Sequence, residues 1–436
     1  MNLKSNFILL LGSKVVALLI SLLTAGIINR ALGPLGRGIY AEMQTWIGLF
    51  AVIWCLSIDT TIYHYANRKQ YSLDDHSKLL TFGGLSLVIA LLSVLAFSAF
   101  IYNFPSQVSA ETSRYLVLLD VLLVLAMLVA SLTNYLLALE QIKLVAFIGV
   151  IQAIISSVII AYGYYKDMVN ISYVILNLII VQTISFAILS VMFLKSGVTR
   201  GRFSWVMAKG MIRMGLKQHI ATISYFIYTR LNQLIVFKYA GEAEAGIFAI
   251  AFNLAFYISI VSDSFRSALF PRVIHSRDEY DVTLRAMCLG FYGGATGILL
   301  LMVLAKPIIL LYAGEKFLSS VNVFRMWLIA AWFLALSSLT TPFYTKKGAF
   351  GLNSFLAVLT GIISLGLNFT LIPAFLATGA AVATAISCFF RFLLMYFFLW
   401  YLSKKNPLKM FIPSFNAEYQ ELKIWLRQGL KYCHII

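Results

Sequence analysis

The sequence predicts an all-α integral membrane protein with about twelve transmembrane helices. The chain has 436 residues, of which 61% are hydrophobic and only 12% are charged. A soluble domain carries about 25% charged residues, so this chain has too little polar surface to cover a globule in water. Its hydrophobic residues also form blocks of about 20 residues, the length that crosses roughly 30 Å of hydrocarbon as a helix. Strands of a membrane barrel would alternate over about 10 residues instead, and the sequence holds no such alternation.

These hydrophobic blocks follow one another along the whole chain and are separated by short polar stretches. The first block continues to Ile28, which is too long for the core of a cleavable signal peptide, so we expect it to remain as a spanning helix. The predicted spans are residues 7–29, 39–62, 79–101, 115–138, 144–163, 171–194, 217–238, 246–267, 287–311, 322–345, 352–374 and 378–402.

The basic residues predict the orientation. A net charge of +17 would favour nucleic-acid binding in a soluble protein. In a membrane protein it reflects the Lys and Arg that collect on cytoplasmic loops. Most of these residues lie in alternate loops and in the C-terminal tail, so we expect both termini in the cytoplasm and no nucleic-acid partner.

A repeated pattern divides the chain into two halves of about six spans. The longest polar connection between spans, residues 195–216, lies between them. A cation, a glycine three residues later and a second glycine after five more occur in both halves at an offset of 208 residues (238 − 30 = 208): Arg30, Gly33 and Gly38, then Lys238, Gly241 and Gly246. We expect these glycines where a tight turn or a positive φ is needed. Parallel repeats of this kind bind their substrate between the two halves.

The predicted organisation has four parts. Residues 1–197 form an N-terminal six-helix bundle, 198–216 a basic cytoplasmic linker, 217–402 a C-terminal six-helix bundle and 403–436 a basic cytoplasmic tail. Apolar residues of the tail recur near helical spacing, and Lys423, Arg427 and Lys431 form a row. This pattern fits an amphipathic helix on anionic lipid, and it fits a short solvated helix without a binding role equally well.

The residues that catalysis or cofactor binding requires are missing from the sequence. The acidic residues of the predicted external loops make no convincing acid–base pair. There is no phosphate-binding G-x-x-x-x-G-K-[ST] motif, and no histidine pair has the spacing of a metal site. We therefore expect a protein that is not an enzyme and that uses no cofactor and no metal.

Charged residues within or beside the spans are the remaining candidates for function, because such groups are costly in a membrane and usually face an internal cavity. Cations outnumber anions about two to one among them, which favours an anionic substrate such as a diphosphate, with Arg as its better partner. Arg230 lies about 20 Å into its span, too deep to reach the cytoplasmic surface; the alternative is a buried pair with a carboxylate. The predicted substrate-binding residues are Arg230, Lys14, Arg30, Arg37, Asn232, Gln233, Arg266 and Arg272.

Several of these residues have simpler interpretations. Lys14 could extend along its helix to the interface. His219, Asp59 and Asp120 are candidates for coupling transport to an ion such as H⁺ or Na⁺. A lone membrane histidine is more often structural, and the two carboxylates lie near helix ends where solvated positions are common.

Three segments carry a family resemblance: residues 30–41, from Arg30-Ala31-Leu32-Gly33 to Tyr40-Ala41; residues 215–219 with 228–235; and residues 307–309 with 311–317. They resemble the polysaccharide (O-antigen type) flippases of bacteria, members of the multidrug/oligosaccharidyl-lipid/polysaccharide (MOP) exporter superfamily. The resemblance covers most of the chain. It implies two six-helix bundles with a V-shaped cleft, alternating access, a location in the bacterial inner membrane and a polyprenyl-diphosphate-linked oligosaccharide as substrate. It also implies polysaccharide polymerase and glycosyltransferases as pathway partners.

One position departs from the family pattern. Many relatives carry Asp where this chain has Asn232, so Arg230 lacks the nearest local carboxylate that could pair with it. The alternatives are a drug exporter of the same superfamily, which would favour an acidic lining, and a membrane-embedded transferase or polymerase of the same pathway, which would need paired external carboxylates. A scaffold without transport would not need deep cations.

Overall fold

The computed structural model describes residues 3–66, 75–139, 141–195 and 201–405, and every regular element in these ranges is helical. The helices are α1 (Leu3–Trp54), α2 (Ile58–Ala66), α3 (Asp75–Asn103), η1 (Pro105–Gln107), α4 (Ala110–Arg114), α5 (Leu116–Ala138), α6 (Ile142–Tyr165), α7 (Ile171–Lys195), α8 (Trp205–Phe226), η3 (Ile227–Leu231), α9 (Asn232–Ala240), α10 (Glu242–His275), α11 (Glu279–Val303), α12 (Ala305–Ala313), η4 (Glu315–Phe317), α13 (Ser320–Leu339), α14 (Thr341–Lys346) and α15 (Phe350–Ser403).

Two of these helices are long enough to cross a membrane twice. Helix α1 has non-helical backbone at Gly33, and α15 has it at Leu376, so each is a pair of spans joined by a bend. The other spans are α3, α5, α6, α7, α8 with α9, α10, α11 with α12, and α13. By length and composition, eight of the described helices can cross a membrane. With α1 and α15 counted twice, these eight helices supply ten spans, and α8 with α9 and α10 complete the predicted all-helical architecture of about twelve spans.

The glycines of the two sequence repeats have two different roles. Gly33 (φ 64°) and Gly241 (φ 87°) both adopt the positive φ that favours glycine, as the pattern predicts. Gly38 and Gly246 lie inside helices, so the prediction of a turn at these two positions is wrong. They are instead the place where α1 and α10 cross. A Cβ on Gly38 would lie 3.0 Å from the amide nitrogen of Gly246, and one on Gly246 would lie 2.1 Å from the Pro34 carbonyl oxygen. Only glycine allows this approach.

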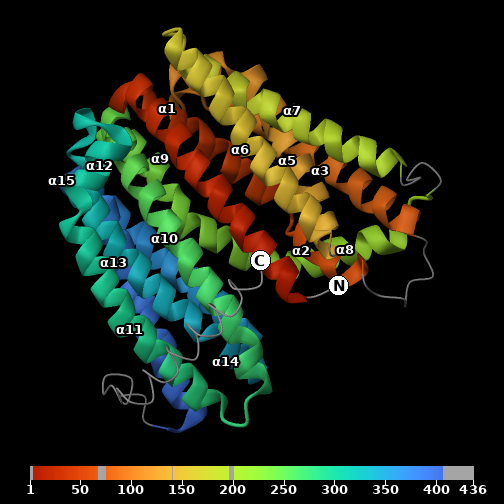
Figure 1. Cartoon of the computed structure of the whole chain (residues 1–436), viewed down its shortest axis with the longest axis vertical. Helices are drawn as coiled ribbons and strands as arrows, with labels where there is room; N and C mark the ends of the chain where they lie inside the picture. Colours follow the sequence, from red (N-terminus) through yellow and green to blue (C-terminus); the bar gives the residue numbers. More distant parts are fainter. Residues whose placement is uncertain (1–2, 67–74, 140, 196–200, 406–436) are drawn as a thin grey trace.

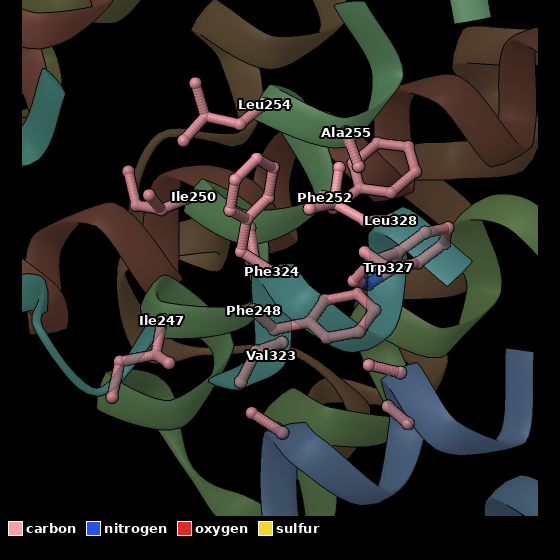
Figure 2. Close-up of a cluster of buried hydrophobic side chains, with 14 of the residues drawn as sticks. Ile247, Phe248, Ile250, Phe252, Leu254, Ala255, Val323, Phe324, Trp327 and Leu328 are labelled. Carbon is pink, nitrogen blue, oxygen red and sulfur yellow. The ribbon is translucent and has the colours of Figure 1, made fainter. Parts of the chain in front are cut away.

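The helices form two bundles that lie side by side at one end of the molecule and diverge toward the other (Figure 1). The first bundle holds α1 to α7, and the second holds α9 to α15. We call the end where they meet, with Gly33, Gly241 and Leu376, the bend end. Each bundle has its own buried apolar clusters, and Figure 2 shows part of the largest one in the second bundle, around Phe248, Phe252 and Trp327.

Helix α8 connects the two bundles. It belongs to the same span as α9, yet its residues Met207, Ala208 and Met211 pack in an apolar cluster of the first bundle. The predicted linker, residues 198–216, overlaps α8, because the described part of it is helical from Trp205. The non-helical connection is therefore shorter than the sequence indicates. The charges that suggested a longer linker lie on an otherwise apolar helix. The predicted tail helix falls in residues 406–436, outside the described residues.

Candidate anion-binding site between the two halves

A polar pocket lies where the two bundles meet. Its walls come from α1 of the first bundle and from η3, α9 and α10 of the second. It holds about 310 Å³ of space, including its open mouth. The lining residues are Arg37, Ala41, Gln44, Thr45, Thr229, Arg230, Gln233, Phe248, Ala249, Phe252 and Asn253.

Part of this lining repeats with the offset of the two halves. Four residues of α1 and four of α10 line the pocket, and three of each form pairs that are 208 residues apart: 41 and 249, 44 and 252, 45 and 253. The close crossing of the two helices at Gly38 and Gly246 begins one turn earlier. The pocket therefore lies on the axis that relates the two repeats, the position at which parallel repeats bind a substrate.

Arg37 is one of two arginines in this pocket, and it is buried without an ion pair to any carboxylate that the structure describes. Only 5% of the residue is exposed. Its Nε and Nη1 have no hydrogen-bond partner, and its guanidinium carbon lies 5.1 Å from the centre of the Tyr40 ring. A buried charge is costly unless it is paired and hydrogen-bonded. The fold thus holds two donor groups of Arg37 unused at the edge of a pocket.

Arg230 is the second arginine, and it lies in the π-helical turn η3, Ile227–Leu231. Single π-turns within α-helices occur frequently at functional sites. The guanidinium stacks on two aromatic rings, at 4.4 Å from Phe252 and 5.3 Å from Phe256. Such stacking is favourable but leaves the in-plane N–H groups available. Among the residues that the structure describes, no carboxylate forms an ion pair with Arg230.

The aromatic ring beneath Arg230 is itself held rigidly. Phe252 packs edge to face against Trp327 at 5.0 Å between ring centres, inside the apolar cluster of Figure 2. Phe248 makes a similar contact with Trp327 at 5.7 Å. The second bundle therefore presents Arg230 on a fixed aromatic platform, and the first bundle presents Arg37 from the opposite wall.

The predicted neighbours of Arg230 have different environments. Gln233 lines the pocket, and its Nε2 donates to the Ala245 carbonyl at 2.8 Å. Asn232 is fully buried inside the second bundle. Its Nδ2 donates to Thr384 Oγ1 at 2.7 Å, and its Oδ1 accepts from Asn368 at 2.6 Å. Asn232 therefore joins three helical segments and does not line the pocket.

The remaining predicted substrate residues are not part of the pocket lining. Arg30 is exposed at the bend end, where its Nη2 donates to the Leu311 carbonyl at 2.6 Å. Arg266 and Arg272 lie on α10, at least 13 residues beyond Asn253 (266 − 253 = 13), or roughly 20 Å along the helix. The side chain of Lys14 lies outside the described residues.

Two of the candidates for ion coupling, His219 and Asp59, lie close enough to interact electrostatically, and Asp120 lies on another helix. His219 of α8 places Nε2 2.9 Å from the Ile53 carbonyl and Nδ1 3.4 Å from Ser57 Oγ, so both ring nitrogens have partners. Asp59 lies in the first turn of α2, two residues beyond Ser57. Asp120 of α5 accepts from Ser98 at 2.7 Å, while its Oδ1 is buried without a partner.

Two contacts at the bend end join the halves, and they start from equivalent positions of the repeats. Arg30 of α1 reaches Leu311 of α12, as described above. Lys238 of α9 donates to Gln107 Oε1 at the end of η1, at 2.7 Å. Because 238 − 30 = 208, each half contributes its repeat cation to the other half. We call these the closing contacts. Together with the crossing at Gly38, they hold the bundles together at this end.

Sequence reasoning missed several pocket residues. Phe252 of the lining, and Phe256, which contacts Arg230 from outside the lining, were not distinguished from the other aromatic residues of the spans. The polar lining residues Gln44, Thr45 and Asn253 were not predicted either. One signal could have found part of the set, since applying the offset of 208 to Thr45 gives Asn253. Among the described residues, no group of three or more His, Cys, Asp or Glu could hold a metal ion.

Comparison with known proteins shows the family to which this chain belongs. The family model described as "Polysaccharide biosynthesis protein" matches residues 3–276. In sequence, no curated protein matches the chain. In structure, the chain is similar to the lipid II flippase MurJ in an inward closed conformation, with 15% identity, a TM-score of 0.73 and coverage of 93% of this chain and 89% of that one.

Two further structures share the fold. An inward-facing multidrug resistance MATE transporter of the MOP superfamily has 13% identity and a TM-score of 0.64, with coverage of 89% of this chain and 96% of that one. A MOP superfamily transporter from Pyrococcus furiosus, described as having a binding pocket of reverse polarity, has 12% identity and a TM-score of 0.59, with coverage of 91% and 93%. The chain therefore belongs to the polysaccharide biosynthesis protein family and has the fold of the MOP superfamily transporters.

Proposed function

We propose that this protein is a flippase that carries a polyprenyl-diphosphate-linked oligosaccharide, such as an O-antigen, capsule or exopolysaccharide unit, across the bacterial cytoplasmic membrane. The observation that carries the proposal is the pocket between the repeats, which Arg37 and Arg230 both line and where no carboxylate of the described ranges pairs with either. The family membership supports a role in polysaccharide biosynthesis.

The charge and geometry of the pocket fit a diphosphate. Each guanidinium can give two parallel charge-assisted hydrogen bonds to phosphate oxygens. Two arginines on opposite walls would each engage one end of the diphosphate, and Gln233 and Asn253 would supply polar contacts beside it. The sugar would lie in the cleft between the bundles while the lipid tail stays in the bilayer.

The proposed mechanism is alternating access. With both termini in the cytoplasm, the bend end is external and the diverging end faces the cytoplasm (Figure 1). The substrate enters from the cytoplasm, the closing contacts break, and the bundles rock about the repeat axis to open the bend end. The membrane potential contributes about 2.3 kcal/mol per charge per 100 mV, and its sign drives an anion outward. Coupling to H⁺ or Na⁺ through Asp59, Asp120 or His219 is a second source of energy.

A drug exporter of the same superfamily is the second candidate, since multidrug transporters share the fold. A site for cationic drugs favours acidic groups, and both charged residues of this pocket are cations. The transporter from Pyrococcus furiosus illustrates that pocket polarity varies within the superfamily. A transferase or polymerase is disfavoured because the described pocket lining holds no carboxylate to act as acid or base.

A flipping assay in proteoliposomes tests the proposal. The purified protein, reconstituted with a fluorescent polyprenyl-diphosphate oligosaccharide, should move the lipid between leaflets, and free inorganic diphosphate should inhibit it. A matched polyprenyl-linked oligosaccharide without the diphosphate should move much more slowly. Equal rates for the two lipids, or transport of cationic drugs alone, would exclude the proposal. Reporter fusions after residues 70, 205 and 410 should be cytoplasmic and one near 315 external, which tests the orientation separately.

A further inference from the structure

Like Arg37, Arg391 of α15 is buried, and it is not part of the lining of the pocket between the halves. It is 8% exposed. Its Nη2 donates to Asn353 Oδ1 at 2.8 Å, and its Nε and Nη1 have no hydrogen-bond partner. Its guanidinium carbon lies 5.8 Å from the centre of the Tyr228 ring. Of the carboxylates that the structure describes, none forms an ion pair with it.

The position of Arg391 makes its isolation costly. It lies 15 residues after the bend at Leu376 and 12 residues before the end of α15 at Ser403, or about 22 Å and 18 Å along the helix. Neither end of the span is within reach of an arginine side chain. A cation at this depth costs at least a few kcal/mol unless it is neutralised. A partner that supplies one negative charge would remove most of this cost.

An apolar pocket extends to the Tyr228 ring beside Arg391, and it provides space for such a partner. The pocket lies inside the second bundle and holds about 440 Å³ of space, including its open mouth. Thr384 and Cys388 line it from α15, and positions 384, 388 and 391 share one face of a helix because they are four and three residues apart. Tyr228 lines the pocket and also lies against the guanidinium.

The pocket walls indicate the size and charge of the partner. Apart from two threonines, they are built from Tyr, Phe, Trp, Cys, Leu and Ala. They offer few donors to a multiply charged group, so a phosphate or diphosphate would remain poorly solvated here. A monovalent ion that needs few hydrogen bonds fits one guanidinium with two unused donor groups. This distinguishes the place from the pocket of Arg37 and Arg230, where two cations face each other.

We propose that Arg391 binds a small monovalent anion of the halide class, which reaches it through the apolar pocket beside Tyr228. The anion accepts hydrogen bonds from Nε and Nη1, and Asn353 holds the third nitrogen. The bound anion neutralises the centre of α15 and stabilises the second bundle. This inference does not depend on the substrate of the pocket between the halves.

The test measures the thermal stability of the purified full-length protein in sodium chloride, bromide and gluconate at equal ionic strength. Chloride and bromide should raise the Tm above the gluconate value in a saturable way, because a ligand that binds only the folded state stabilises it. In Arg391→Gln this halide-specific increase should disappear. In the control variant Arg37→Gln it should persist, because Arg37 lines only the pocket between the halves.

The opposite pattern would overturn the proposal: an increase that persists in Arg391→Gln and disappears in Arg37→Gln places the ion between the halves. The absence of any halide-specific increase in the wild type would also overturn it. If Arg391→Gln does not fold, anomalous diffraction from bromide-soaked crystals of the wild type decides the question. A bromide peak in contact with the guanidinium supports the site, and an empty map at that position rejects it.

Discussion

Helix α1 carries two buried charges only five residues apart, Arg37 and Glu42, and they differ in how fully they are hydrogen-bonded. Glu42 is 1% exposed. It accepts four hydrogen bonds: from Ser109 N–H at 2.9 Å, Ser109 Oγ at 2.5 Å, Thr112 Oγ1 at 2.8 Å and Trp46 Nε1 at 3.1 Å. Arg37 is similarly buried, yet two of its nitrogens have no partner.

This difference separates a structural charge from a functional one. Three of these four bonds come from the segment that begins α4, where Ser109 is also the N-cap residue, so the carboxylate anchors that turn to α1. Once its acceptors are used, Glu42 has little capacity left for a ligand. Arg37 retains its donors and pays the desolvation cost in the free protein. A ligand that satisfies those donors recovers this cost on binding.

The largest expected effect is the loss of transport when a pocket cation is removed. Arg230→Ala should abolish transport with little loss of folded protein, because the residue makes no ion pair that the fold needs. Arg230→Lys keeps the charge but not the planar fork, so it should retain part of the activity. The measurement is surface polysaccharide in a complemented deletion strain, normalised to the protein level in the membrane.

Normal polysaccharide from Arg230→Ala would exclude a role for this residue in substrate binding. Failure of the variant to accumulate would instead indicate a structural ion pair. A second-site change of a carboxylate to a neutral residue that restored accumulation would then identify the partner.

Removing each of the two charges on α1 in turn should change the free energy of unfolding in opposite directions. Glu42→Ala leaves the Ser109, Thr112 and Trp46 donors buried without an acceptor, which should cost about 3 kcal/mol or more. Arg37→Met removes unsatisfied donors and keeps much of the volume, so it should leave stability unchanged or raise it by about 1 kcal/mol while transport is lost. Thermal unfolding in detergent and transport per folded molecule separate the two effects. A large loss of Tm in Arg37→Met would show that Arg37 is structural after all.

The crossing of α1 and α10 allows a test at the residue next to Arg37. A Cβ on Gly38 would lie 1.8 Å from the Glu242 carbonyl oxygen, so Gly38→Ala must separate the helices and should cost about 1–3 kcal/mol. Gly83 of α3 is the matched control, since a Cβ there meets no atom within 4 Å. Gly83→Ala should be neutral or slightly stabilising. Equal Tm values for the two variants would contradict the close crossing.

The sequence predicted the spans, the family and the bends well, because the signals for these features are local. Blocks of apolar residues indicate spans, and Gly33 and Gly241 need only their own backbone angles. The prediction that Arg230 faces a cavity also followed from one residue, its depth and the lack of a nearby carboxylate. Its position in the pocket lining agrees with that expectation, while its role in transport stays a prediction.

What the sequence could not give were contacts between distant segments. Whether the side chains of Glu42 and Arg37 find hydrogen-bond partners depends on residues such as Ser109, which lies 67 positions beyond Glu42. Asn232 was expected beside the substrate, but its partners come from 136 and 152 residues further along the chain. The crossing at Gly38 and Gly246 likewise needed the packing of the two halves, since a repeated glycine alone does not distinguish a turn from a close approach.

The smallest effect is expected when an exposed charged side chain is removed. Its size should depend on whether the hydrogen-bonded pair joins the two bundles or lies within one of them. Lys238 with Gln107 and Arg30 with Leu311 join the two halves, whereas Lys405 with Asp278, at 2.6 Å, joins elements of the second bundle only. Lys238→Ala and Arg30→Ala should each weaken closure of the bend end by about 1 kcal/mol, a shift of roughly fivefold toward opening. Lys405→Ala should not change it, because its pair does not cross between the bundles.

A cysteine at Gln44, which lines the pocket, reports this shift in a background without native cysteines. Its labelling by a membrane-impermeant maleimide added from outside should speed up in Lys238→Ala and in Arg30→Ala, and more in the double variant. It should stay at the parent rate in Lys405→Ala. If all three single variants were labelled at the parent rate, the closing contacts would be surface pairs without influence on the two halves. If Lys405→Ala were labelled as fast as Lys238→Ala, loss of an exposed charge rather than loss of a contact between the halves would explain the change.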